Sequence, residues 1–204
     1  MCGIIGIVGV EPVTPRLVES LKRLEYRGYD SAGVAAVTDP QRVERRRAKG
    51  KIRELENVLA ADPLGGTVGI GHTRWATHGA PSVTNAHPQT AGRVTVVHNG
   101  IIENFAPLKA ELEAEGRKFE SQTDSEVVAQ LIDRELSHGS GPLEALKATL
   151  DRLSGAFALA VLIEGEDEMI LGARRGSPLV VGYGEGEMFL GSDALAVGPF
   201  TNKV

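Results

Sequence analysis

Hydrophobic residues recur along the chain in two kinds of run, short continuous ones and longer ones with helical spacing. Residues 3–10 are apolar throughout, which predicts a buried β-strand. Leucines spaced as on a helix then follow Thr14 and Pro15, so we expect a helix over residues 15–24 with Thr14 as its N-cap. The opening of the chain is therefore predicted to be a strand followed by a helix.

The remaining elements come in blocks and not in a strict strand–helix alternation. Helices are expected over residues 51–60 and after Asn104, Thr123 and Pro142. Asn104 can cap its helix, and Glu126 can reach back to Thr123 in a capping box. Strands are expected over residues 31–37, 43–49, 68–70, 94–98, 156–163, 169–173, 179–181 and 188–190. Many of these strands are almost wholly apolar, which favours a layered α+β sandwich with helices outside the sheets.

Composition adds limits to this picture. A chain of 204 residues that is 42% hydrophobic is expected to form one domain, residues 1–204, or 2–204 after removal of Met1. The net charge of −5 does not suggest a nucleic-acid partner, and no run reaches the ~20 apolar residues of a membrane span. The single cysteine allows no internal disulfide, and the start does not resemble a signal peptide. We expect a cytoplasmic protein.

That cysteine stands directly behind Met1. If Met1 is removed, Cys2 carries a thiol and a free α-amine, and an α-amine with a pKa of about 7.7–8.0 can accept a proton near neutrality. Cys2 is thus a candidate nucleophile with its own base. The competing interpretation is that it merely begins a buried strand.

Polar clusters at the expected strand ends supply candidates for the rest of a site. Asn99 and Gly100 could form an oxyanion hole, although Asn-Gly taken alone favours a tight hairpin turn. Arg74 could clamp a carboxylate or be an ordinary surface arginine. Asp124 could accept a hydrogen bond from an ammonium group or simply cap a helix. No phosphate-binding glycine loop is present and the five histidines lack metal-ligand spacing, so we expect no metal and no cofactor.

Taken together, seven ordered motifs resemble those of the class II glutamine amidotransferases, the N-terminal-nucleophile family. They are MCGIIG at 1–6, LEYRGYDSAG at 24–33, GHTRWATHG at 71–79, NAHP at 85–88, HNGIIENF at 98–105, SQTDSE at 121–126 and RRGSPL at 174–179. The aromatic residues Tyr26, Tyr29 and Trp75 favour the branch that aminates a hexose phosphate over the amidophosphoribosyltransferases, which remain the alternative. The resemblance implies a four-layer α-β-β-α sandwich of two mainly antiparallel sheets.

The resemblance also implies a role for each candidate residue. L-Glutamine would be hydrolysed to glutamate and ammonia through a γ-glutamyl thioester on Cys2, with the α-amine as general base and acid. Arg27 would help to orient that amine, and Asn99 and Gly100 would form the oxyanion hole. The substrate contacts would come from Arg74, Thr77 and His78 to the α-carboxylate, from Gly100 and Asp124 to the α-amino group, and from Trp75 as a gate.

Three further expectations concern the molecule as a whole. In the hexose-phosphate branch of this family the ammonia aminates fructose 6-phosphate in a C-terminal isomerase domain, which we expect to be missing from this chain. A homodimer would form through the longer protein. If Met1 were retained, the blocked amine would favour a non-catalytic domain that senses glutamine.

Overall fold

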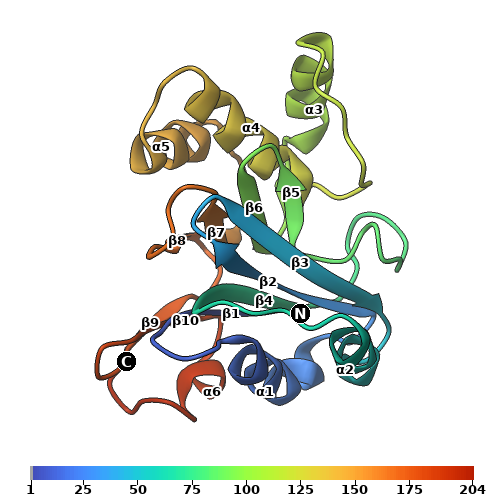
Figure 1. The fold of residues 1–204 in the computed structure, drawn as a ribbon. Helices are drawn as coiled ribbons and strands as arrows, with labels where there is room; N and C mark the ends of the chain where they lie inside the picture. The colour runs from blue at the N-terminus through green and yellow to red at the C-terminus, as the bar shows by residue number, and fades with distance from the viewer. Residues whose placement is uncertain (1) are drawn as a thin grey trace.

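Two antiparallel sheets stacked face to face form the centre of the computed structural model, which describes residues 2–204 (Figure 1). Sheet A has the strand order β3-β2-β4-β1-β10-β9, and sheet B has the order β5-β6-β7-β8. The strands of sheet A are β1 (Gly3–Val8), β2 (Ser31–Asp39), β3 (Arg42–Lys49), β4 (Val68–Arg74), β9 (Val180–Tyr183) and β10 (Met188–Gly191). Those of sheet B are β5 (Gln89–Ala91), β6 (Val94–Gly100), β7 (Phe157–Ile163) and β8 (Leu171–Arg175).

Helices cover the outer face of each sheet (Figure 1). On sheet A lie α1 (Thr14–Leu24), α2 (Ile52–Ala61) and the short α6 (Ala194–Val197), and a 3-10 turn, Glu25–Arg27, follows α1. On sheet B lie α3 (Phe105–Ala114), α4 (Ser125–Ser137) and α5 (Pro142–Arg152). None of these helices has the length and apolar character needed to cross a membrane.

The middle core lies between the sheets, where Ile4 and Ala35 of sheet A pack against Val97 and Ala160 of sheet B. These strands are buried on both faces, which explains why their sequences are almost continuously apolar. The layers therefore run helix, sheet, sheet, helix, and the expected four-layer α+β sandwich is confirmed.

Three of the local capping predictions are wrong. Thr14 is the first residue of α1, and its hydroxyl donates to the carbonyl of Leu64 at 2.8 Å instead of capping the helix. The Glu126 carboxylate accepts from the backbone N–H groups of Glu120 and Ser121, so no capping box forms with Thr123. Asn104 occupies the N-cap position of α3, but its side chain bonds the backbone of Arg152 and Ser154. In each case a more distant partner replaces the local one.

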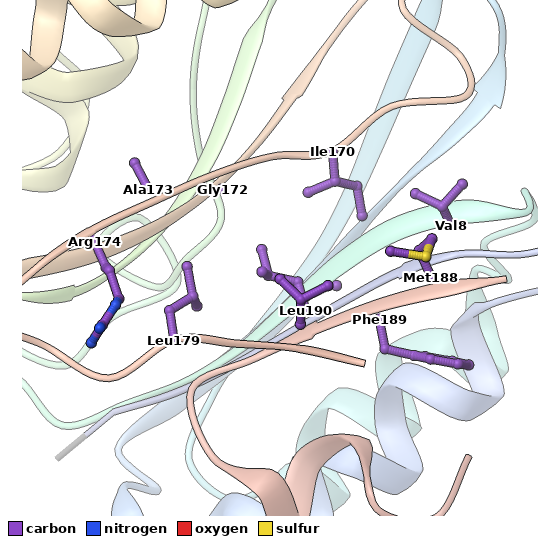
Figure 2. Close-up of a pocket in the computed structure, with 11 residues that line it drawn as sticks. Val8, Ile170, Gly172, Ala173, Arg174, Leu179, Met188, Phe189 and Leu190 are labelled. Carbon is purple, nitrogen blue, oxygen red and sulfur yellow. The ribbon is translucent and has the colours of Figure 1, made fainter. Parts of the chain in front are cut away.

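An apolar cavity of about 380 Å³ opens between the sheets beside β8 and β10 (Figure 2). Ile170, Leu179 and Leu190 are among the residues that line it, and Arg174 is its one charged lining residue. It has no cluster of titratable groups and Cys2 does not line it. The chemistry predicted from the sequence therefore belongs elsewhere in the fold.

Candidate active site

Cys2 lies immediately before β1, in the middle of sheet A. The β1–β4 pairing sets Gly3 opposite Thr73, which brings Cys2 beside the segment that follows β4. The Cys2 sulfur accepts a hydrogen bond from the backbone N–H of Trp75 at 3.1 Å. Partial burial raises the pKa of the thiol above its usual value, and the bond from Trp75 only partly offsets this. The thiol is therefore protonated at neutral pH and needs a base to become a nucleophile.

Asn99 and Gly100 end strand β6 and do not form a hairpin turn. They pair with Ala158 and Phe157 of β7, so the turn interpretation is wrong. The Asn99 side-chain nitrogen donates to the carbonyl of Cys2 at 3.0 Å. Gly100 has a φ of +116°, and a Cβ there would lie 2.1 Å from the Ala156 carbonyl, so this position requires glycine.

Arg74 is the last residue of β4 and is buried, with only 3% of its surface exposed. One guanidinium nitrogen, Nη2, donates to the carbonyls of His78 and Gly79 and so folds the intervening loop around the arginine. The other, Nη1, lies 3.9 Å from Asp30 and has no hydrogen-bond partner within residues 2–204. The surface-arginine interpretation is therefore wrong. A buried donor without a hydrogen-bond partner is available to a ligand.

Asp124 is buried at the start of α4 and makes no capping bond to that helix. One carboxylate oxygen accepts from the backbone N–H of Ile102 at 2.8 Å, and the other lies 3.9 Å from His98 Nδ1. This second oxygen is available to a cationic group. The plain N-cap interpretation is thus excluded as well.

Two hollows meet at Cys2, and between them they contain all nine residues predicted from the sequence. A cavity of about 300 Å³ is lined by Cys2, Arg27, Trp75, Thr77, Asn99, Gly100, Ile101, Ser177 and Pro178. A narrower cleft is lined by Cys2, Arg74, Trp75, Thr77, His78, His87, His98, Gly100, Thr123, Asp124 and Ser125. Segments far apart in the sequence thus converge on one sulfur.

Arg27 is held by a segment, Ser192 and Asp193, that the sequence analysis did not assign to the site. Its guanidinium donates to the Ser192 carbonyl at 3.1 Å and to Asp193 at 3.3 Å. The Ser192 hydroxyl oxygen in turn accepts from the N–H of Ile4 at 2.8 Å. Arg27 therefore stabilises, through Ser192, the backbone at Ile4 that follows Cys2. Nothing in the local sequence around residue 192 indicates this connection.

Three buried histidines lie at the cleft or next to it: His87 and His98 line it, and His72 packs against His87. No group of three potential metal-ligating side chains occurs among the described residues. Instead, His87 and His98 both contact the Ser125 hydroxyl, at 2.6 and 2.8 Å, and the His87 ring stacks on His72. Burial lowers the pKa of all three, that of His72 to about 3, so they are neutral at pH 7.

Comparison with known proteins places this geometry in a family. A model of the glutamine amidotransferase domain matches residues 72–198. Over all 204 residues the chain is 76% identical to a glutamine–fructose-6-phosphate aminotransferase (isomerizing) of Caulobacter vibrioides, and the alignment covers 34% of that protein. It is 63% identical to the Brucella suis protein of the same name, of which the alignment covers 33%. The chain spans about a third of the length of these curated relatives.

Solved structures agree on the fold. The glutamine phosphoribosylpyrophosphate amidotransferase of Bacillus subtilis is 29% identical with a TM-score of 0.82, over 97% of this chain and 43% of that one. A class-II glutamine aminotransferase domain protein of Silicibacter pomeroyi has a TM-score of 0.63 at 20% identity, over 93% of this chain and 88% of that one, and shares the fold. With the family model covering more than half of its length, the chain belongs to the glutamine amidotransferase domain family.

Proposed function

We propose that this chain hydrolyses L-glutamine to L-glutamate and ammonia, with Cys2 as the nucleophile. The observation that carries the proposal is the convergence of a thiol, an oxyanion-hole pair and two oppositely charged anchors on two hollows that meet at Cys2. Acyl transfer from a side-chain amide needs these parts, and glutamine has one amide, one carboxylate and one ammonium group to match them.

The thiol begins the reaction once Met1 is removed. The free α-amine of Cys2 takes the thiol proton, and the thiolate attacks the side-chain carbonyl carbon while the carbonyl electrons move to oxygen. Asn99 Nδ2 has a second hydrogen besides the one on the Cys2 carbonyl, and this hydrogen and the Gly100 N–H stabilise the oxyanion. The amine returns its proton to the leaving nitrogen, which departs as ammonia. Water then hydrolyses the thioester to glutamate.

The anchors orient the substrate along the cleft. The partnerless nitrogen of Arg74 bonds the α-carboxylate, with Thr77 and His78 beside it. The less engaged oxygen of Asp124 accepts from the α-ammonium group. Trp75 is half exposed at the mouth of both hollows and closes over the bound substrate.

The acceptor of the ammonia follows from the relatives. Identity of 76% to a glutamine–fructose-6-phosphate aminotransferase, against 29% to the phosphoribosylpyrophosphate enzyme, supports fructose 6-phosphate as the acceptor in a longer protein. The isomerase domain that binds this sugar would be the partner, in a cytoplasmic homodimer. The amidophosphoribosyltransferase alternative is the less supported.

The test uses protein whose intact mass shows that Met1 has been removed. We expect this protein to release ammonia from glutamine, and Cys2→Ser to bind glutamine but release none. An electrophilic glutamine analogue with a diazoketone in place of the amide should label Cys2 alone. Binding without turnover in the parent protein would favour the glutamine-sensing alternative, and a label on another residue would contradict the assignment.

A further inference from the structure

His72 contacts the oxyanion-hole asparagine from the side opposite Cys2. It lies in the middle of sheet A on β4 and is fully buried. Its Nε2 is 2.9 Å from the backbone carbonyl of His98 and 3.1 Å from Oδ1 of Asn99. The Asn99 amide thus lies between His72 and the Cys2 carbonyl.

The protonation of His72 follows from these partners. A backbone carbonyl can only accept, so the nitrogen that contacts the His98 carbonyl must carry a hydrogen. Because burial keeps the ring neutral, Nδ1 carries none, and it has no partner within the described residues. His72 is therefore the neutral Nε2–H tautomer.

This tautomer determines which way the Asn99 amide faces. The one hydrogen on Nε2 is shared between the His98 carbonyl and the Asn99 amide, and of the two amide atoms only the oxygen can accept it. The NH₂ group therefore points towards the Cys2 carbonyl. If the amide rotated by half a turn, two donors would meet at His72 and two acceptors would meet at the Cys2 carbonyl. The oxyanion hole would then present an oxygen to the developing negative charge.

We propose that His72 is a positioning residue that holds the Asn99 amide with its N–H directed into the oxyanion hole. The inference rests on the function proposed above and adds to it a residue that does not touch the substrate. The ring itself is held in place by His87, whose ring centroid lies 4.3 Å away at an interplanar angle of 30°. His87 is fixed in turn by Ser125 at the start of α4.

The main test compares His72→Leu with His72→Gln. Leucine removes the N–H donor, and we expect it to lower kcat for glutamine by about tenfold to a hundredfold, no more than loss of the oxyanion donor in Asn99→Ala. The KM should change little because the oxyanion exists only in the transition state. Glutamine places an amide N–H near the position of Nε2 and should recover most of kcat.

A double variant separates positioning from general structural damage. If His72 acts through Asn99, His72→Leu should reduce kcat little further in the Asn99→Ala background, whereas independent effects would multiply. The matched control is Leu146→Ala, on the buried face of α5. This substitution should destabilise the fold at a place remote from Cys2 and leave kcat unchanged. Multiplying effects, or no recovery in His72→Gln, would overturn the proposal.

Nitrogen-15 NMR of the imidazoles tests the geometry without turnover. We expect His72 to give the signals of a neutral ring protonated at Nε2, unchanged from pH 8 to pH 5. An Nδ1–H tautomer would overturn the positioning role even in an active protein. Conversely, absence of ammonia release from the parent protein would refute the proposed function, while the NMR result would still decide how Asn99 is held.

Discussion

At the scale of single residues, Arg74 shows how burial turns a common surface side chain into a candidate binding group. One of its nitrogens donates to the loop carbonyls of His78 and Gly79, and the other lies 3.9 Å from Asp30 without a hydrogen-bond partner within residues 2–204. The first nitrogen stabilises the loop and the second is available to a ligand. The same side chain therefore contributes to both the shape of the cleft and its charge.

We predict that Arg74→Ala raises the KM for glutamine by roughly tenfold to a hundredfold, since a charge-assisted hydrogen bond is worth about 1.5–3 kcal/mol. The kcat should fall less, because the carboxylate is remote from the reacting amide. Steady-state ammonia release measures both constants. Arg23→Ala, an exposed arginine paired only with Glu19, is the control and should behave like the parent. An unchanged KM for Arg74→Ala would exclude the clamp.

Residue chemistry explains what could be predicted at this scale. Cys2, Asn99 and Arg74 carry groups whose reactivity is visible in the sequence, and all nine predicted site residues line the two hollows. The role of His72 depends on a partner 27 positions away, so no local pattern reveals it. The cap at Thr14 fails for the same reason, because its hydroxyl bonds the carbonyl of Leu64, 50 positions away. The Glu126 carboxylate instead accepts from backbone groups 5 and 6 positions before it, outside the capping-box pattern.

At the scale of elements, the site depends on how closely β2 approaches the segment before β5. A Cβ at Gly33 of β2 would lie 2.1 Å from the His87 carbonyl, which no side chain can tolerate. The close approach of the His87 backbone to Gly33 therefore determines where His87 lies. The His87 ring in turn packs against the ring of His72. One glycine in an interior strand thus links sheet A, through His87 and His72, to Asn99.

We predict that Gly33→Ala lowers the free energy of unfolding by about 1–3 kcal/mol, the usual cost of overpacking. It should also reduce kcat, because His87 must move. Chemical denaturation and ammonia release measure the two effects. Gly65→Ala is the matched control, since a Cβ there meets nothing within 4 Å. Equal stability of the two variants would show that β2 adapts to the methyl group.

Elements were predictable where they are long and periodic. The three helices over sheet B and the β2–β3 and β9–β10 hairpins occur where the pattern places them. Strand β5, of 3 residues, and helix α6, of 4 residues, are too short to produce a periodic signal. Strand β4 extends beyond its apolar start to Arg74, because its second half pairs with both neighbouring strands, β1 and β2.

At the scale of the whole molecule, the three neutral histidines between the layers make stability depend on pH. Their pKa values are lowered in the folded chain, whereas in the unfolded chain each is near 6.5. Below pH 6.5 the unfolded chain therefore binds protons that the folded chain does not. Stability is complete above this pH and declines as the pH falls.

We predict a loss of at most about 1.4 kcal/mol per pH unit for each histidine below pH 6.5. Urea denaturation between pH 7.5 and pH 5 tests this in a range above the pKa of most carboxylates. His87→Gln should reduce the slope of the unfolding free energy against pH by the contribution of about one proton. His138→Gln, at an exposed position, should leave that slope unchanged. A stability that does not change over this range would mean that the histidines titrate normally.

The layered architecture itself could be predicted because strands buried on both faces need cover from both sides. The order of the strands within each sheet could not, since pairing between β1 and β10 joins residues 180 or more positions apart.

Trp75 is the chain's one tryptophan, and its own backbone N–H contacts the Cys2 sulfur. Its indole is 52% exposed and meets Tyr29 edge to face, so the ring is already in contact with water in the folded protein. Intrinsic fluorescence excited at the red edge therefore comes from this position alone. The fluorescence of Trp75 will therefore change when a ligand binds beside it. Thermal unfolding is better followed by circular dichroism, because the indole is already exposed to water in the folded protein.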